Sequence, residues 1–341
     1  MNEIDSDGRL RVAAGVLRNA RGAILLTRRG DGRAFAGAWE FPGGKIERGE
    51  TAAMALAREL NEELGIAIAA DRITPVIAVP CDHGGKRILL EVYEVPTWRG
   101  TARGREGQAL AWTRPERLAD YTMPPADLPV VAALTRPACY VISPDPGDPD
   151  DDPDFADFLA RFEQVLADGA RRVQLRAKRL DGDRLGLLAA RCLARCREFE
   201  AELLINGCPP LARELGCGVH LTSAQLRTLA DRPLEPDLPV AASCHDAEEL
   251  AMAQTIGVDF AVLGPVRATA SHPLASPLGW GGFARIREPF ALPVYALGGL
   301  GPEDLTAARR HGAQGIAGIS RFWPSTDATM APRLDATARM P

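Results

Sequence analysis

The sequence has no excess of positive charge and no long apolar run, and its number of cysteines is not even. Its 341 residues carry a net charge of -5 at pH 7. A duplex DNA-binding protein normally presents a basic face, so this balance argues against binding to duplex nucleic acid. No apolar stretch is long enough to span a membrane, and no secretory segment is evident. The seven scattered cysteines indicate free thiols in a reducing cytoplasm.

The length indicates two domains or one large one. A hydrophobic content of 46% with 25% charged residues is ordinary for a globular protein that buries a sizeable core. A helical pattern stops near Pro137, and an apolar strand pattern starts at once behind it. We therefore expect domains over residues 1–135 and 138–323, followed by a C-terminal tail over 324–341. The sequence is silent on oligomeric state.

A helix with an apolar face and an acidic face is predicted between Thr51, a suitable N-cap, and Gly65, a suitable C-terminal stop. At about 100° per residue, one face is apolar: Ala53, Leu56, Leu60 and Leu64. Three carboxylates are neighbours on another face: Glu59, Glu62 and Glu63. Arg58 is expected to hold Glu62. Such a face suits solvent, but it also supplies the oxygen ligands that Mg²⁺, with Mn²⁺ as a possible substitute, takes in proteins.

The full spacing of this stretch is more specific than the helix alone. It runs Gly44, five residues, Glu50, seven residues, and then the sequence from Arg58 to Ile66. This pattern resembles the Nudix box. Around it, strands are predicted at 11–17, 23–27, 73–79, 87–95 and 109–112, with a closing helix at 128–134. The first two strands are expected to form a hairpin, and the whole suits an α/β/α sandwich.

Within Nudix enzymes, three segments resemble the MutT branch, which cleaves oxidised purine nucleoside triphosphates: residues 39–47, 104–108 and 124–127. The resemblance covers roughly residues 10–134 and implies a small-molecule nucleotide substrate. It implies metal ligands at Gly43, Glu59, Glu62, Glu63 and Glu106. It implies substrate contacts at Arg29, Phe41, Lys45 and Asp127. Either Glu62 or Glu106 would be the catalytic base, and the sequence does not say which.

Asp127 stands where that family has an asparagine that reads the base. Oxidation at C8 turns guanine N7 into an N–H donor. An ionised carboxylate accepts that proton, but unlike an amide it cannot donate to O6. Asp127 is therefore compatible with 8-oxoguanine recognition and weakens the expectation of tight selection. As an alternative, Asp127 is only the N-cap of the closing helix.

Beyond residue 138, short apolar runs alternate with helical segments. Eight strands are expected, at 139–143, 173–176, 203–206, 218–221, 239–243, 260–263, 294–297 and 315–319. Eight such units in under 200 residues indicate a (β/α)8 TIM barrel. Function in this fold lies at the carboxyl ends of the strands. A phosphate-binding set is expected there: Arg176, Lys178, Asn206, Thr269, Gly298, Gly299 and Ser320.

The barrel half resembles the thiamine phosphate synthase/TenI family over roughly residues 138–323. The matching segments are residues 174–178, 218–221, 243–245, 264–266 and 296–299. The synthase has a metal-binding Asp where this chain has Gly207, and another within the segment that here reads 222–225. Without these carboxylates, activation of a diphosphate by Mg²⁺ is hard to support. The retained His245 is more like TenI, the thiazole tautomerase, so His245 is the candidate for proton transfer, with a packed loop histidine as the alternative.

Three functions remain open. The first is an 8-oxo-dGTP pyrophosphohydrolase with a role in mutation avoidance, joined to a barrel of uncertain activity. The second is a bifunctional thiamine-pathway enzyme, in which the Nudix domain cleaves a pyrimidine or thiamine diphosphate and the barrel isomerises a thiazole phosphate. In the third, the barrel is a non-catalytic module that binds a phosphorylated metabolite. The motifs around Glu106 and Asp127 favour the first.

Overall fold

The computed structural model describes residues 2–323, apart from positions 7, 33, 84, 148–151, 153, 181 and 269–275. The chain divides near Arg136 and Pro137 into two units. Each unit has its own core and is described separately. The expected tail over residues 324–341 lies outside the described residues.

The first unit contains two sheets between two helices. One sheet has the order β4-β1-β7-β6, the other has the order β3-β2-β9, and β5 pairs with β8. The strands are β1 (Leu10–Leu17), β2 (Ile24–Arg28), β3 (Trp39–Glu40), β4 (Gly43–Lys45), β5 (Ala67–Ile68), β6 (Thr74–His83), β7 (Lys86–Val95), β8 (Trp98–Arg99) and β9 (Leu110–Thr113). The helices are α1 (Ala52–Leu64), the 3-10 helix η1 (Pro115–Asp120) and α2 (Leu128–Thr135).

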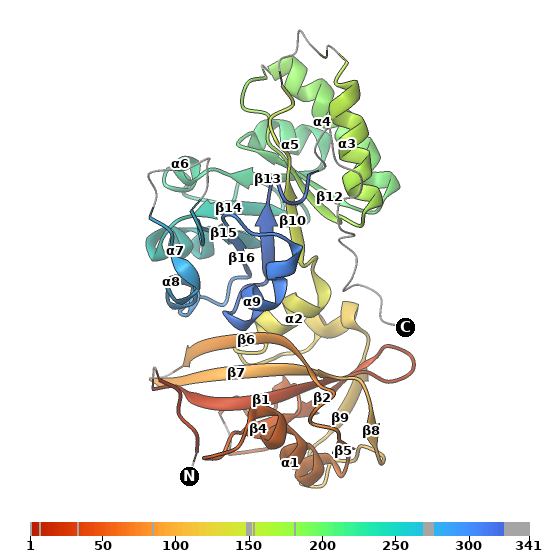
Figure 1. The fold of residues 1–341 in the computed structure, drawn as a ribbon, viewed down its shortest axis with the longest axis vertical. Coiled ribbons are helices and arrows are strands. Elements are labelled where there is room, and N and C mark those ends of the chain that lie inside the picture. Colours follow the sequence, from red (N-terminus) through yellow and green to blue (C-terminus); the bar gives the residue numbers. More distant parts are fainter. Residues whose placement is uncertain are drawn as a thin grey trace. The chain divides into compact units, whose positions relative to one another are not determined.

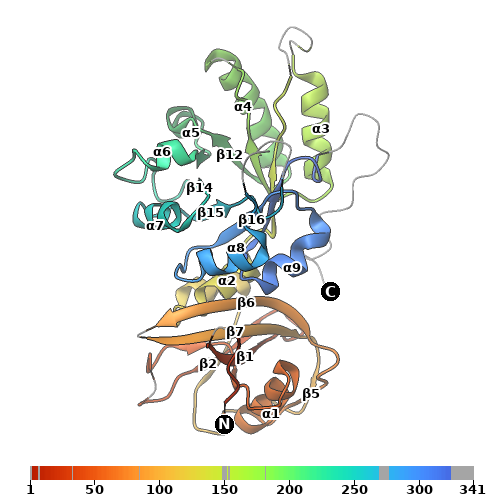
Figure 2. The same cartoon turned by 60° about the vertical axis from the view of Figure 1, so that its left-hand side comes forward.

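The two helices cover opposite sides of the sheets (Figure 2), and each side has its own core. Leu56 and Leu60 of α1 pack with Ala13 and Leu17 of β1. Val130 of α2 belongs to the other core. Alternate residues of β1 thus enter different cores, as a strand buried on both faces requires. This arrangement confirms the predicted α/β/α sandwich.

Helix α1 begins and ends where its sequence predicts. The hydroxyl of Thr51 accepts a 3.2 Å hydrogen bond from the amide of Met54, and Gly65 ends the helix at φ 70°. The buried stripe consists of Ala52, Ala55, Leu56, Leu60 and Leu64. The prediction that Ala53 belongs to this stripe is wrong, since Ala53 is only half-buried.

The expected hairpin between the first two strands is also wrong. Its turn exists, because the side-chain oxygen of Asn19 accepts hydrogen bonds from the amides of Arg21 and Ala23 at 2.9 and 3.0 Å. A single bridge, between Arg18 and Ile24, closes the turn. Strand β1 then pairs with β4 and β7, while β2 joins β3 and β9. The alternation of apolar residues fixes two buried faces on each strand but leaves its partners open.

The second unit is a closed barrel of eight strands, all paired in parallel (Figure 1). The strands are β10 (Cys139–Ile142), β11 (Arg172–Leu175), β12 (Glu202–Asn206), β13 (Gly218–Leu221), β14 (Val240–Cys244), β15 (Phe260–Leu263), β16 (Val294–Leu297) and β17 (Gly315–Gly318). The helices are α3 (Ala156–Ala167), α4 (Gly182–Glu198), α5 (Pro209–Leu215), α6 (Ser223–Leu226), α7 (Ala247–Thr255), α8 (Gly279–Arg287), η2 (Pro302–Asp304) and α9 (Leu305–Arg310). The predicted TIM barrel is confirmed.

The barrel interior combines apolar layers with buried polar groups. Tyr140, Phe260 and Tyr295 pack together with ring centroids 5.2 to 6.0 Å apart. The guanidinium of Arg172 lies over the Phe260 ring at 4.4 Å and donates to the hydroxyl of Tyr295 at 2.8 Å. Its ion pair with Glu202, at 2.6 Å, completes the compensation of this buried charge.

All seven cysteines are described, and none of them forms a disulfide. Cys192 and Cys196 lie buried in the core outside the barrel strands. Burial raises the pKa of the Cys196 thiol to about 12, so this group packs as a neutral side chain. Within the described ranges, the helices lack the length and hydropathy that crossing a bilayer would take.

Candidate active sites

Arg58 organises the acidic face of α1. Its guanidinium donates two 2.9 Å hydrogen bonds to the two carboxylate oxygens of Glu50, and one more of 2.9 Å to Glu59. A longer contact of 3.4 Å reaches Glu62, as the i,i+4 spacing predicts. The hydrogen bonds from Arg58 are also the main cause that lowers the pKa of Glu50. A single cation thus spaces carboxylates that would otherwise repel one another.

Two glycines let strand β4, just before α1, approach its neighbours closely. A Cβ on Gly44 would lie 2.3 Å from the carboxyl carbon of Glu59. A Cβ on Gly43 would lie 2.1 Å from the backbone oxygen of Ala13. Any larger residue at Gly44 would therefore displace the Glu59 carboxylate. The Glu59 carboxylate of α1 thus lies directly against strand β4 at Gly44.

A cavity of about 330 Å³ lies beside this helix. Three residues that the sequence singles out meet in it from separate segments: Arg29 after β2, Glu63 on α1 and Glu106 on the loop before β9. Gln108 fixes that loop, because its side chain accepts from the amide of Glu106 at 2.9 Å and donates to the backbone oxygen of Glu63 at 3.2 Å. The cavity can therefore present carboxylates and a guanidinium to one charged ligand.

The donors of this region suit a hard divalent cation. Carboxylates and a loop carbonyl are the ligand types that Mg²⁺ takes, and Glu62 is 60% exposed and accessible to a solvated ion. In the described part of the chain, however, no three His, Cys, Asp or Glu side chains converge as an assembled metal site. The residues fit the cation by chemistry, with the carboxylates spread along α1 around Arg58.

Asp127 does not cap α2 with its side chain, although it occupies the N-cap position. Its carboxylate instead accepts a 3.3 Å hydrogen bond from the amide of Phe41, 86 residues away. Burial raises the pKa of Asp127 to about 7, helped by the nearby charge of Glu40 and opposed by the Phe41 amide and by Arg29. Asp127 is thus an acceptor when ionised and also a donor when protonated, near neutral pH.

Two other residues expected at the substrate lie differently. The Phe41 side chain is buried in the sheet core, and its backbone amide donates to Asp127. The Lys45 side chain is exposed, while its backbone oxygen accepts from Arg58 at 3.0 Å. Neither side chain lines the cavity that Arg29 shares with Glu106.

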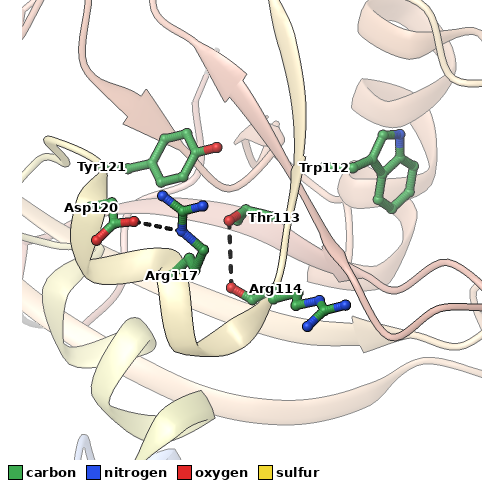
Figure 3. Close-up of a pocket in the computed structure, with 6 residues that line it drawn as sticks. All are labelled: Trp112, Thr113, Arg114, Arg117, Asp120 and Tyr121. Carbon is green, nitrogen blue, oxygen red and sulfur yellow. Dashed lines mark hydrogen bonds and ion pairs between the residues drawn. The ribbon is translucent and has the colours of Figure 1, made fainter.

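A further cavity of about 380 Å³ lies on the first unit near β9 and η1 (Figure 3). The ion pair of Arg117 with Asp120, at 2.8 Å, lies beside Tyr121, and Trp112 lies apart from them. Trp112 also stacks on Trp98, with ring centroids 6.1 Å apart. None of the residues expected for catalysis lines this cavity, so the cavity beside α1 is the candidate site.

In the barrel, the expected phosphate-binding residues follow the carboxyl ends of the parallel strands, and these ends share one side of a barrel. Described members of the set are Arg176, Lys178, Asn206, Gly298, Gly299 and Ser320. Thr269 lies outside the described residues. Arg176 is half-buried, and its amide donates to the buried hydroxyl of Ser143 at 2.9 Å. This end of the barrel, the barrel mouth, presents basic side chains and two glycines.

The positions that lack the synthase carboxylates are filled by a closed set of neutral hydrogen bonds. Gly207 adopts φ 71°, and its backbone oxygen accepts from the side-chain amide (Nε2) of Gln225 at 2.8 Å. The oxygen of the Gln225 side chain in turn accepts from the amide and hydroxyl of Thr222 at 3.1 and 3.2 Å. This capping box uses Gln225 to begin helix α6. The local chemistry is therefore that of a helix cap, without a carboxylate at Gly207 or Gln225.

His245 follows β14 and is half-exposed, with 51% of its side chain accessible. Its Nδ1 lies 2.9 Å from a carboxylate oxygen of Glu249, which also accepts from the His245 amide at 2.7 Å. The other oxygen of Glu249 accepts from Arg227 at 2.8 Å and from the hydroxyl of Ser223. Burial acts to raise the pKa of Glu249, but the hydrogen bonds from Ser223 and His245 outweigh it and lower the pKa. Glu249 is thus a buried, ionised partner of His245.

His220 is a different kind of histidine. Burial lowers its pKa to about 3, so the ring is neutral. Gln174 donates to the hydroxyl of Tyr140 at 3.2 Å, which leaves the proton of Tyr140 for Nδ1 of His220 at 3.1 Å. Nε2 then donates to Ser243 at 2.8 Å. His220 is a buried element of a hydrogen-bonded chain, in line with a structural role.

Sequence reasoning missed two acidic residues. Glu40 pairs with Arg29 and lines the cavity beside α1, and Glu249 holds His245. A signal for Glu249 was present, because it stands four residues after His245 on a helical segment. For Glu40 the signal was weaker, since the motif around it did not show which face of its short strand it takes.

Family models place both halves of the chain. A model described as thiamine monophosphate synthase (TMP-TENI) matches residues 139–322, and a model described as NUDIX domain matches residues 8–134. The fold and the two site regions define an α/β enzyme that joins a hydrolase domain to a TIM barrel. The chain belongs to the Nudix family through its first domain and to the TMP-TENI family through its second.

Three curated relatives are similar to separate halves. The 8-oxo-dGTP diphosphatase of Escherichia coli (strain K12) is 38% identical over 128 residues, covering 38% of this chain and 98% of that protein. The CTP pyrophosphohydrolase of the same organism is 41% identical over 113 residues, covering 33% and 82%. The putative thiamine-phosphate synthase 2 of Aquifex aeolicus (strain VF5) is 37% identical over 166 residues, covering 48% and 89%. The first domain is accordingly a Nudix hydrolase domain with relatives named as 8-oxo-dGTP diphosphatases.

Proposed function

We propose that the first domain is a divalent-metal-dependent nucleoside triphosphate pyrophosphohydrolase that converts 8-oxo-dGTP to 8-oxo-dGMP and pyrophosphate, and so avoids mutation. The observation that carries the proposal is the cavity beside α1, where Arg29, Glu63 and Glu106 meet. A triphosphate needs both positive charge and metal-binding carboxylates around it, and this cavity offers both kinds of group. The similarity to proteins named 8-oxo-dGTP diphosphatase supports the same substrate.

In this proposal, Mg²⁺, or Mn²⁺ in its place, would be held by Glu59, Glu62, Glu63, Glu106 and the backbone oxygen of Gly43. The bound cation would neutralise the triphosphate and favour deprotonation of the attacking water. A carboxylate oxygen of Glu62 or Glu106 accepts the proton of that water. The water oxygen bonds to one phosphorus of the α–β bridge as that phosphorus loses its bond to the bridging oxygen, so the products are 8-oxo-dGMP and pyrophosphate. Arg58 does not touch substrate but holds Glu50 and Glu59 in place.

Asp127 supports selection of the oxidised base. Its carboxylate lies at the Phe41 amide, close to the charges of Glu40 and Arg29 that belong to the cavity lining. When ionised, it accepts the N7–H that only the oxidised guanine carries. When protonated, it can also donate, as an amide does. The proposal therefore places Asp127 at the base and the α1 carboxylates at the phosphates.

The test is kcat/KM for 8-oxo-dGTP, dGTP and CTP with Mg²⁺, with pyrophosphate as the detected product. CTP is included because one relative is named for its hydrolysis. A preference for 8-oxo-dGTP over dGTP of at least about 100-fold, some 2.7 kcal/mol, would support the proposal. Equal turnover of the two guanine nucleotides, or faster turnover of CTP, would refute this substrate.

For the barrel we propose a second activity, isomerisation of a phosphorylated thiazole, as in a thiazole phosphate tautomerase. The observation that favours it is His245 at the barrel mouth, held by Glu249, together with basic residues and without the synthase carboxylates. The domain pairing leaves a thiamine-pathway role of the whole chain as the alternative, with a phosphorylated pyrimidine or thiazole as ligand. Loss of isomerisation in His245→Ala would support the tautomerase. An inactive parent protein would favour a non-catalytic binding module.

A further inference from the structure

Glu249 joins helix α7 to helix α6, but this contact does not explain all of its hydrogen bonds. It lies on α7 with 1% of its side chain accessible, yet both of its oxygens accept hydrogen bonds. Ser223 and Arg227, at either end of α6, bind one oxygen. The second oxygen is directed to His245 alone, through both its backbone amide and Nδ1. The helix contact thus uses only half of the carboxylate.

We propose that Glu249 is a positioning residue that sets the tautomer of His245 at the barrel mouth. An ionised carboxylate only accepts hydrogen bonds, so Nδ1 of a neutral His245 must carry the proton. The lone pair then lies on Nε2, on a ring that is half-exposed at the carboxyl end of β14. A histidine whose second nitrogen is held by a carboxylate has a fixed ring orientation and a defined basic atom.

The rest of the cluster keeps the carboxylate in place. The amide of Glu249 donates to Asp246, the N-cap of α7, at 2.8 Å, which fixes the first turn of that helix. On the facing element, Thr222 and Gln225 form the capping box that orients Ser223. Because each oxygen of Glu249 has two donors, the side chain has little freedom to turn away from His245. Of the charged groups in this cluster, Glu249 contacts His245, while Arg227 and Asp246 contact Glu249.

The consequence for chemistry rests on the proposed tautomerase activity. Nε2 would take a proton from one carbon of the phosphorylated heterocycle and return it to another, so that ring and substrate end with their original proton counts. The imidazolium formed between the two steps would be stabilised by the Glu249 carboxylate at Nδ1. Without Glu249, the ring would turn and its basic atom would alternate between the two nitrogens.

The decisive experiment is ¹⁵N NMR of ring-labelled histidines in the full chain, at a pH where the rings are neutral. His245→Asn assigns the His245 signals. We expect protonation of His245 at Nδ1 and of buried His220 at Nε2, because Tyr140 donates to Nδ1 of His220. The two histidines should therefore show opposite tautomers in one spectrum. An Nε2-protonated His245 in the parent protein would overturn the proposal.

Two variants separate positioning from simple stability. Glu249→Leu removes the hydrogen bonds to both oxygens, and His245 should lose its fixed Nδ1 proton. The matched Arg227→Met removes one of the two hydrogen bonds from α6 and leaves those to His245, so the Nδ1 proton should stay. An unchanged tautomer in Glu249→Leu would overturn the proposal. If Glu249→Leu does not fold, Glu249→Asp is used, which moves the carboxylate away by one methylene. In Glu249→Asp, the fraction of His245 protonated at Nδ1 should fall. An unaltered tautomer would again overturn the proposal.

The kinetic readout distinguishes this proposal from the proposed barrel activity. In Glu249→Leu, kcat for thiazole isomerisation should fall by about 100-fold with KM changed less than about 3-fold, and Arg227→Met should stay within about 3-fold of the parent. If the parent protein shows no isomerisation but the Nδ1 tautomer depends on Glu249, the tautomerase fails and the positioning role holds. If isomerisation is present and insensitive to Glu249, the positioning role fails and the tautomerase holds.

Discussion

The carboxylates of the two domains differ in what surrounds them. On α1, Glu62 is 60% exposed and Glu59 is 17% exposed, and a single arginine serves both together with Glu50. In the barrel, Glu249 is 1% exposed and has donors from Ser223, Arg227 and His245. The first set has more negative charge than its neighbours neutralise and can accept a cation. The second is saturated with donors and can only orient them.

The same contrast holds for the ligands that each site would take. The cavity beside α1 combines Glu63 and Glu106 with Arg29, so a triphosphate there needs a cation to offset the carboxylates. The barrel mouth offers Arg176 and Lys178, and its Gly207 and Gln225 are neutral, so a monophosphate could bind there directly. Both domains are suited to phosphate compounds, but by opposite electrostatic means.

Removing one charge from the acidic face of α1 should have the greatest effect on activity. Glu62→Gln keeps the size of an exposed side chain but removes its charge, so metal-dependent hydrolysis should fall about 1000-fold in kcat while folding is unchanged. The matched control is Glu116→Gln, an exposed carboxylate on η1 of the same domain, which should retain full activity. Unchanged turnover in Glu62→Gln would exclude the α1 carboxylate from catalysis.

A smaller effect concerns Asp127, the buried carboxyl of the first domain. Its pKa of about 7 in the folded state lies above the ordinary value of 3.8, so the folded state loses stability as pH rises from about 4 to 7. At about 1.4 kcal/mol per pKa unit, the penalty above pH 7 is about 4 kcal/mol at most. Asp127→Asn keeps an acceptor for the Phe41 amide without this penalty. It should therefore be more stable than the parent at pH 8 and nearly equal at pH 4.

The free energy of unfolding of parent and variant is measured by urea titration at several pH values. Hydrogen exchange of the segment around Phe41 serves as the local probe of unfolding. Asp120→Asn is the control, since Asp120 is exposed and pairs only across the surface with Arg117. It should show the same pH dependence as the parent. A stability gain of Asp127→Asn that does not grow with pH would contradict a raised pKa of Asp127.

Adding carboxylates to the barrel mouth should have the weakest effect, a gain of cation binding. Gly207→Asp with Gln225→Asp would place two carboxylates where the barrel now has a neutral cap, and should create a weak site, with Kd on the order of 1 mM, for one additional Mn²⁺ per chain. Gly207→Asn with Gln225→Asn is the matched neutral control and should bind no additional ion. Titration followed by electron paramagnetic resonance counts bound Mn²⁺. Equal counts in the two variants would mean that other groups decide cation binding at the mouth.

Much of the fold could be predicted because its signals are local. Strand alternation, the Thr51 cap and the Gly65 stop depend on neighbouring residues, and the barrel follows from repetition of one short unit. The pairing of β1 with β7 could not be predicted, since β1 is followed by a turn that suits a hairpin equally well. Strand partners are chosen by contacts between residues far apart in sequence, which no local pattern records.

The site shows the same division. The spacing along α1 places Glu62 beside Arg58, and the i,i+4 contact exists. The side chain of Asp127 was harder to place, because its partner Phe41 lies 86 residues away and competes with the local cap. Likewise, Phe41 belongs to a motif that suggests substrate contact, yet its ring fills the core. The motif does not reveal this burial, because the core is formed by residues far apart in sequence.

The most direct test of the central claim is the ratio of kcat/KM for 8-oxo-dGTP to that for dGTP, measured with Mg²⁺ for the parent and for Glu62→Gln. We expect a ratio of at least about 100 in the parent and loss of turnover of both nucleotides in the variant. A ratio near 1 in the parent, or a variant as active as the parent, would contradict the claim that the α1 carboxylates and Asp127 form a site for the oxidised nucleotide.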